Sequence, residues 1–235
     1  MASELQRVAR GLVDCFDEIP RVVEQLQRTA VRCRENAQLA LIASRGQATV
    51  AAQQLDAAAR ACERLGARVV ELPSAWMFDW NDLSVILLAE AWGYHARHGE
   101  LHDRYRPAIA EFVETAREFV SLPSYLAAQG RRAVGVEAWE RWFESFDVDL
   151  VLEPTLPIVP YERGPGYDRG HAGGPGDPMI ALTALWDMTG MPVASLPVSW
   201  EIGVSLIAPR GHEAPLVQAA IDLQEHELGI PAWPD

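Results

Sequence analysis

A cluster of histidines is the first feature of this sequence that could carry acid–base or metal chemistry. His95, His98 and His102 lie close together, and three carboxylates are nearby: Glu90, Glu100 and Asp103. His95 and His98 are three residues apart and could ligate a metal ion from one helix face. However, Gly99 is expected to end that helix, and no third ligand follows at a fixed spacing. The sequence therefore favours exposed or capping histidines, with a metal or catalytic role as the alternative, and we predict no metal site.

The basic residues set a second constraint on the chemistry. The chain has 20 of them, and every one is arginine, so no lysine amine is present to act as a base. The arginine guanidinium stays protonated, with a pKa above about 12, and cannot replace it. The glycine-rich run GGPGD at residues 173–177 also lacks a serine. We assign no catalytic residue from the sequence and expect no cofactor.

Length and composition are those of an ordinary globular chain. It has 235 residues, of which 49% are hydrophobic, and a formal net charge of -13. Nucleic acid and anionic membranes would repel such a charge, so neither is expected as a partner. We recognise no signal peptide and no membrane-spanning run. The odd number of cysteines, Cys15, Cys33 and Cys62, disfavours a disulfide framework, and we expect a cytoplasmic protein.

Two regions differ in their pattern. Residues 1–57 are expected to form an α-helical N-terminal extension, because apolar residues recur at helical spacing within it. The run LALIAS, which begins at Leu39, is ambiguous between a strand and a helix. Residues 58–235 form the second region. It begins in an amphipathic helix closed by Gly66 and continues into the strand ARVVELP.

Helices and short strands follow one another along the second region. Five further helices are expected. One runs from Asn81 or Asp82 to Gly99, one begins at Pro107 and one begins at Ser124. A fourth ends at Gly190, and the last runs from Glu213 to Glu227. In the helix from Ser124, the side chains expected to point inward are Val134, Trp139, Trp142, Phe143 and Phe146. Strands are expected over DVDLVLEP, PVASLPV and GVSLIAP, and the segment 163–178, rich in glycine and proline, should be a loop. This order predicts an α/β fold: a mixed β-sheet of four to five short strands flanked by helices.

Four stretches, taken in order, resemble the C-terminal part of the amidase-signature family of serine hydrolases. They are AARACERLGARVVEL, DVDLVLEPTLPIVP, TALWDMTGMPVASLP and GVSLIAPRGHEAPLVQAAIDLQE. The resemblance covers roughly residues 58–227 and implies the fold of that family's C-terminal half and, by descent, hydrolysis of carboxamide C–N bonds. Three positions depart from the family pattern: Asp187 replaces an asparagine, Ser205 replaces a glutamine and Ala208 replaces a glycine.

The resemblance also implies a substrate cleft. In the family the Pro-Thr-Leu-Pro segment lies near this cleft, so the pocket-wall residues carried over are Thr155, Leu156, Trp186, Met188 and Met191. Glu213, next to His212, would cap the last helix by binding its free N–H groups. The family's chemistry rests on a Ser–cis-Ser–Lys triad and a loop rich in glycine and serine. Both lie N-terminal to the region matched here.

Two functional hypotheses follow. In the first, the chain is an amidase-family region that is catalytically incomplete on its own: a truncated product, or a chain complementing another that carries the lysine and serines. A small amide would then be its substrate only when it is complemented. In the second, the chain is a non-catalytic protein-interaction or structural module whose helical extension packs against a partner or a second copy. A marginally folded fragment without activity is a third interpretation.

Overall fold

The computed structural model describes residues 38–41, 52–75, 78–119, 121–156, 180 and 182–229. The helices expected before residue 38, with Cys15 and Cys33, lie outside these residues. So do Trp76 and the loop expected over 163–178.

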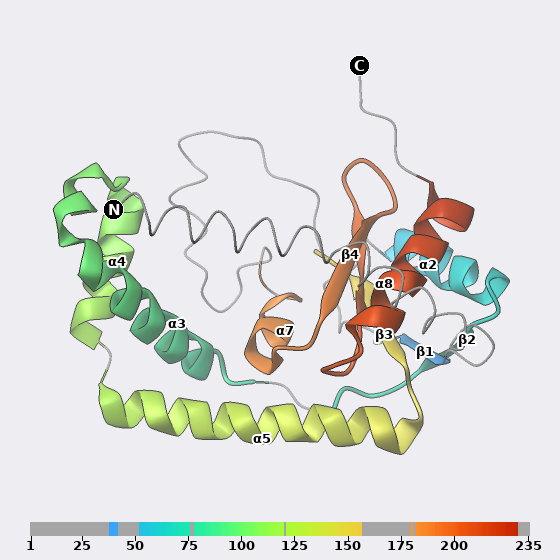
Figure 1. Cartoon of the computed structure of the whole chain (residues 1–235), viewed down its shortest axis with the longest axis horizontal. Coiled ribbons are helices and arrows are strands. Elements are labelled where there is room, and N and C mark those ends of the chain that lie inside the picture. The colour runs from blue at the N-terminus through green and yellow to red at the C-terminus, as the bar shows by residue number, and fades with distance from the viewer. Residues whose placement is uncertain are drawn as a thin grey trace, which may run out of the picture.

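A five-stranded sheet forms the centre of the molecule. Its strands are β1 (Gln38–Leu41), β2 (Arg68–Glu71), β3 (Leu150–Pro154), β4 (Val193–Pro197) and β5 (Gly203–Ile207), in the spatial order β2-β1-β3-β5-β4. β1 is parallel to both β2 and β3, whereas β5 is antiparallel to both β3 and β4. The predicted mixed sheet is therefore confirmed, with helices on both faces (Figure 1).

One face of the sheet is covered by two amphipathic helices. α2 (Ala52–Arg64) and α8 (Glu213–Leu223) pack on Leu150 and Leu152 of β3 and on Val204 and Leu206 of β5. Gly66 follows α2 with a φ of 92°, a left-handed conformation that glycine adopts without strain. A short π-helical segment, Gln224–Leu228, extends α8 and brings Glu227 to Arg64, whose Nε donates to it over 2.6 Å.

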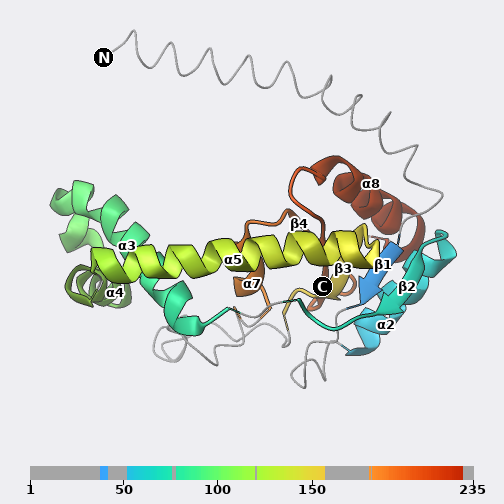
Figure 2. The same cartoon turned by 90° about the horizontal axis from the view of Figure 1, so that it is seen from below.

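The opposite face of the sheet carries the aromatic core. The long helix α5 (Leu122–Phe146) and the short helix α7 (Ala184–Thr189) pack against Val151 and Ile207. Figure 2 shows α5 running past the sheet, with α7 beside it. Trp139 of α5 is fully buried, and its ring lies 5.0 Å from that of Trp186 in an edge-to-face arrangement. Aromatic contact of this kind joins the two helices.

The N-terminal half of α5 also supports a helical lobe. α3 (Trp80–His95) is followed by a 3₁₀ segment (Ala96–Arg104) and by α4 (Pro107–Phe119). Asp82 of α3 is only 2% exposed, and Arg131 of α5 binds its carboxylate through two hydrogen bonds of 2.7 and 2.5 Å. This bidentate ion pair fixes the lobe to α5.

The structure corrects several expected boundaries and faces. The N-cap of α3 is Asp79, whose carboxylate accepts the N–H of Asn81, so neither Asn81 nor Asp82 is the cap. The helix ends at His95 rather than at Gly99. In α5, which begins at Leu122 rather than Ser124, Trp139, Trp142 and Phe143 point inward as expected. Val134 and Phe146 do not: they are 59% and 43% exposed, because the sheet and α7 occupy a different side of this helix.

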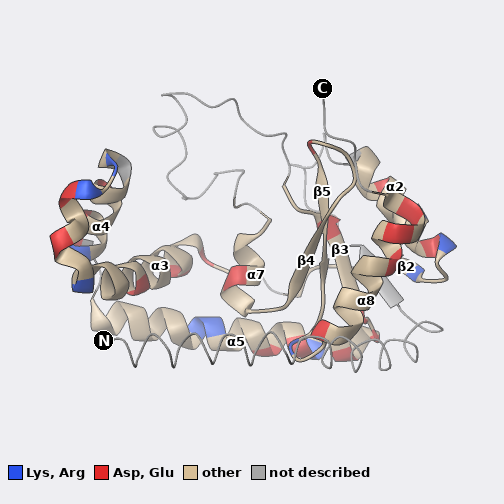
Figure 3. Ribbon diagram, turned by 45° about the horizontal axis from the view of Figure 1, so that its top comes forward, with Lys and Arg blue, Asp and Glu red and all other residues tan. Residues whose placement is uncertain are grey.

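The first three residues of the LALIAS run, Leu39 to Leu41, lie in a strand. β1 (Gln38–Leu41) pairs with both β2 and β3, so this part of the predicted helical extension belongs to the sheet. For the residues before Gln38 the extension, and with it the division into 1–57 and 58–235, stays a prediction. Within the described segments, the structure has no helix with the length and apolarity needed to cross a bilayer. Figure 3 shows acidic and basic positions interspersed along the helices.

Candidate functional site

A buried glutamate marks the face of the sheet on which α7 packs. Along β3, Leu150 and Leu152 point towards α2 and α8, so Val151 and Glu153 point towards α7. Glu153 is 5% exposed, and its carboxyl accepts a hydrogen bond from Nε1 of Trp186. Trp186 is itself 4% exposed. A carboxyl group and an indole N–H are thus paired inside an otherwise apolar core.

Burial dominates the ionisation of Glu153. Removal from water disfavours its charged form and raises its pKa from 4.5 to about 8, while the hydrogen bond from Trp186 acts in the opposite direction and only partly offsets this. The side chain is therefore mostly a neutral carboxylic acid at pH 7. Its carboxylate becomes a proton acceptor only near and above pH 8.

Three hydroxyl groups continue this polar strip across the sheet. Glu153, Ser205 and Ser195 are direct neighbours on β3, β5 and β4. Thr155 lies two residues beyond Glu153, and its Oγ1 is 2.9 Å from Oγ of Ser195 and 2.9 Å from Oγ of Ser205. Gly203 makes the arrangement possible, since a Cβ there would lie only 3.1 Å from Thr155 Oγ1. The result is a chain of hydroxyls that runs from the buried Ser205 to the exposed Ser195.

The predicted pocket-wall residues fall in two groups around this strip. Trp186, Met188 and Met191 lie on α7 or just after it, and all three are buried in the aromatic core. Thr155 and Leu156 are half-buried at the end of β3. The hydrogen bond between Glu153 and Trp186 connects the two groups.

Sequence reasoning did not identify Glu153, Ser195 and Ser205 as one polar set. A usable signal was present for Glu153: it is a lone acidic residue that follows three apolar residues in a strand expected to be buried. A carboxyl group in such a position must be neutral or hydrogen-bonded. The two serines carried no comparable signal, because their proximity depends on the register of three strands.

The departures from the family pattern have different consequences. Ser205 supplies one of the hydroxyls just described, and Ala208 is buried in the core beneath α8. Asp187 has its side chain exposed on α7. Partial desolvation still raises the pKa of this carboxyl above its ordinary value.

The histidines near the 3₁₀ segment bind neighbouring groups of their own lobe. Nδ1 of His95 lies 2.9 Å from the hydroxyl of Tyr105, and Nε2 of His102 lies 3.0 Å from the backbone oxygen of His95. His98 faces Glu100 at 4.0 Å. Among the residues that the structure describes, no three His, Cys, Asp or Glu side chains are grouped to hold a metal ion.

Glu213, the predicted cap of the last helix, and Cys62 lie on α8 and α2, the two helices that cover one face of the sheet. His212 is the N-cap residue of α8 and Glu213 lies in the first turn, but neither side chain forms a capping hydrogen bond. Glu213 can therefore act there only through its charge near the helix N-terminus. Cys62 is buried on α2, and burial raises the pKa of its thiol to about 12, which leaves it an unreactive packing residue.

Comparison with known proteins places the fold. No protein-family model matches the sequence, and no curated protein matches it. A bacterial aryl acylamidase of the amidase signature family matches the structure with a TM-score of 0.63 at 18% identity, over 84% of this chain and 45% of that chain. A second match is the structure of a vestigial protein complex that reveals the evolutionary origins of an s-triazine catabolic enzyme. Its TM-score is 0.63 at 24% identity, and the match covers 83% of this chain and 44% of that chain. Allophanate hydrolase from Kluyveromyces lactis matches with a TM-score of 0.61 at 13% identity, over 80% of this chain and 32% of that chain.

The chain therefore has the fold of part of an amidase-signature enzyme. It spans less than half the length of each of the three structures just named. The predicted resemblance is confirmed at the level of the fold.

Proposed function

We propose that this chain is an amidase-type region that forms one side of the substrate site of a carboxamide C–N hydrolase and does not hydrolyse amides by itself. The observation that carries the proposal is the fold shared with amidase-signature enzymes. The absence of lysine from the sequence supports the second half of it, because the family's serine nucleophile is activated by a lysine.

Glu153 is not a replacement for that lysine. Its carboxyl is mostly protonated at pH 7, and among the described residues its hydrogen-bond partner is the indole N–H of Trp186 rather than a hydroxyl group. A general base must be deprotonated and within hydrogen-bond reach of the nucleophile. The nucleophile and the base would then come from a further polypeptide segment, either on a separate chain or on a longer form of this one.

The sheet offers such a segment a place to pair. β4 is the last strand of the sheet in the part of the chain that the structure describes, and β5 is its neighbour on one side. Val193, Ser195 and Pro197 of β4 are exposed. An edge strand with unpaired backbone groups is a ready template for another strand. We propose that the complementing segment docks here, close to the hydroxyl of Ser195.

Complementation tests this proposal. Two samples would be assayed on a panel of aryl amides. The first is the purified chain alone, and the second is the mixture obtained by co-expressing it with a chain that is encoded by a neighbouring gene and carries a Gly-Ser-rich loop and a lysine. We expect turnover only in the mixture. Leu156→Ala at the predicted pocket wall should raise KM in that mixture, whereas Leu72→Ala, a half-buried leucine beside β2, should leave it unchanged. Turnover by the isolated chain equal to that of the mixture would refute the proposal.

The second candidate is the non-catalytic interaction module. It is favoured by exposed apolar side chains on α5: Leu122 at 69%, Leu126 at 59% and Val134 at 59%. Three such residues on one helix are a plausible protein contact. Light scattering after size-exclusion chromatography separates the candidates. A tight homodimer without activity in any mixture would support the module, and a monomer that gains activity on complementation would support the amidase region.

A further inference from the structure

A groove between α5, the end of α7 and the turn after β5 has the properties of a ligand site. Its volume is about 390 Å³, and its walls include Arg132, Ala133 and Val136 of α5, Gly190 after α7, and Arg210 in the turn. This volume is at the lower end of the range for small-molecule sites. None of these residues belongs to the predicted pocket wall, and the inference below does not depend on the proposed function.

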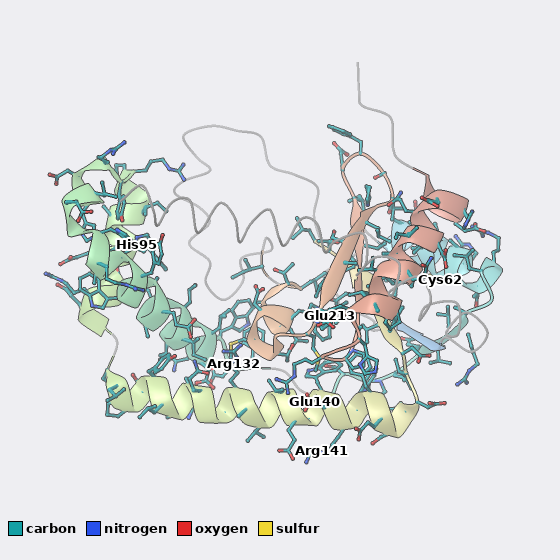
Figure 4. All side chains as sticks on the ribbon, in the orientation of Figure 1. Cys62, His95, Arg132, Glu140, Arg141 and Glu213 are labelled. Atoms are coloured by element: carbon teal, nitrogen blue, oxygen red, sulfur yellow. The ribbon has the colours of Figure 1, made fainter. Side chains whose placement is uncertain are left out.

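Two of the charged groups in the groove are already neutralised by partners. Glu140 accepts a hydrogen bond of 2.8 Å from Nε of Arg210, which comes from the opposite wall. Glu137 accepts one of 2.8 Å from Arg141, on the same helix. Figure 4 shows Arg132 on the side of α5 that faces α7, while Arg141 extends from the other side of the helix. The carboxylates at the rim of the groove therefore each have a cation of their own.

Arg132 differs from these groups. Its Nε donates to the backbone oxygen of Met188 over 2.6 Å, and its Nη1 lies 3.5 Å from Oε1 of Gln129. Within the described segments its contacts are thus with neutral oxygens. The side chain is half-buried, and the short bond to Met188 holds the guanidinium in one orientation. A guanidinium fixed in this way recognises a carboxylate at a low entropic cost.

We propose that this groove binds a small monocarboxylate that carries an apolar body, with its carboxylate on Arg132 and its apolar part against Ala133 and Val136. The lining agrees with this class of ligand. Among the described residues Arg132 has no acidic partner, so its one positive charge matches one negative charge, and the methyl groups of Ala133 and Val136 offer an apolar surface beside it. A dianion such as a phosphate monoester would bring a second negative charge, for which the described walls of the groove hold no further unpaired cation, because Arg210 is bound to Glu140.

Isothermal titration calorimetry of benzoate binding to the full chain, in a buffer free of carboxylates, tests the proposal. Benzamide and phenyl phosphate serve as the neutral and dianionic analogues. We expect benzoate to bind in the millimolar range and more tightly than either analogue. Arg132→Gln should weaken benzoate binding by about tenfold or more, since a charge-assisted pair is lost. Arg97→Gln is the matched control, because Arg97 also donates to a backbone oxygen, that of Gly93, but lies outside the groove.

A second variant keeps the guanidinium and removes the space. Val136→Phe should fill the groove and weaken benzoate binding while Arg132 and its bond to Met188 remain, and circular dichroism reports whether each variant is folded. Three results would each overturn the proposal: benzamide or phenyl phosphate binding as tightly as benzoate, unchanged affinity in folded Arg132→Gln, or unchanged affinity in folded Val136→Phe. The absence of benzoate binding at any concentration up to its solubility would overturn it as well.

Discussion

Trp186 donates its indole N–H to the carboxyl of Glu153, and this single hydrogen bond joins helix α7 to strand β3 inside the core. The two residues are 33 positions apart in sequence, and both are less than a tenth exposed. The pair links α7 to β3, beside which lie the residues that the family resemblance predicts for a pocket wall.

Glu153 should make the stability of the protein depend on pH. Its pKa is about 8 in the folded state, against an ordinary value of 4.5, so the folded chain binds more protons between these values than the unfolded chain. The free energy of unfolding should therefore fall as pH rises through this window, by up to about 1.4 kcal/mol per pH unit from this group. Glu153→Gln should remove this contribution. Urea unfolding between pH 5.5 and 8.5 measures it.

The control for this experiment is Glu201→Gln, in the exposed turn between β4 and β5. It should keep the pH dependence of the wild type. A Glu153→Gln protein whose unfolding free energy changes with pH as steeply as that of the wild type would show that the carboxyl is ionised in the folded state.

The ion pair between Asp82 and Arg131 should contribute more to the stability of the fold than an exposed ion pair does. Arg131→Ala leaves the carboxylate of Asp82, which is 2% exposed, without its bidentate partner. We expect a clear loss of stability, because the buried carboxylate is left without its hydrogen bonds. Arg117→Ala, which breaks an exposed pair with Glu114, should cost less than about 1 kcal/mol. Equal losses in the two variants, measured by urea unfolding, would contradict the assigned burial of Asp82.

Two residues of α5 test which side of the helix faces the core. Trp139 is fully buried against Trp186, whereas Val134 is 59% exposed. Trp139→Ala should destabilise the fold by about 3–5 kcal/mol through the cavity that it leaves. Val134→Ala should change the stability by no more than about 0.5 kcal/mol. Thermal unfolding would reveal a rotated helix as a large effect at Val134 and a small one at Trp139.

Two glycines should respond to alanine with opposite signs. Gly190 ends α7 with a φ of 66°, where a Cβ is strained, so Gly190→Ala should destabilise by about 1–2 kcal/mol. Gly130 lies inside α5 and has open space around it, so Gly130→Ala should stabilise by about 0.5–1 kcal/mol. Differential scanning calorimetry would show this as a lower Tm for the first variant and a higher Tm for the second. A higher Tm in both variants would contradict the assigned conformation of Gly190, and a lower Tm in both would contradict the open space around Gly130.

Local patterns in the sequence were sufficient to predict most elements of the fold. The glycines at positions 66 and 190 ended their helices as expected, and the apolar runs before Pro154 and Pro197 formed strands. The faces of α5 were harder to predict, because apolar residues occur on more than one side of this helix. Only the position of the sheet and α7 decides that Trp139 is buried and Val134 is not.

The polar site depended on contacts that no local pattern encodes. Thr155 is hydrogen-bonded to Ser195 and Ser205, which lie 40 and 50 residues away in sequence. Arg131 binds Asp82, which lies 49 residues away. These pairs follow from strand register and from the packing of two helices. The fixed orientation of Arg132 likewise depends on the end of α7, because the backbone oxygen of Met188 accepts its hydrogen bond.

The most direct test of the central claim uses a serine-reactive phosphonate probe on the purified chain, with intact mass spectrometry and an aryl amide assay on the same sample. Because the sequence contains no lysine and Glu153 is bound to Trp186, we predict no covalent adduct and no hydrolysis. Stoichiometric labelling of one serine together with sustained turnover would contradict the account.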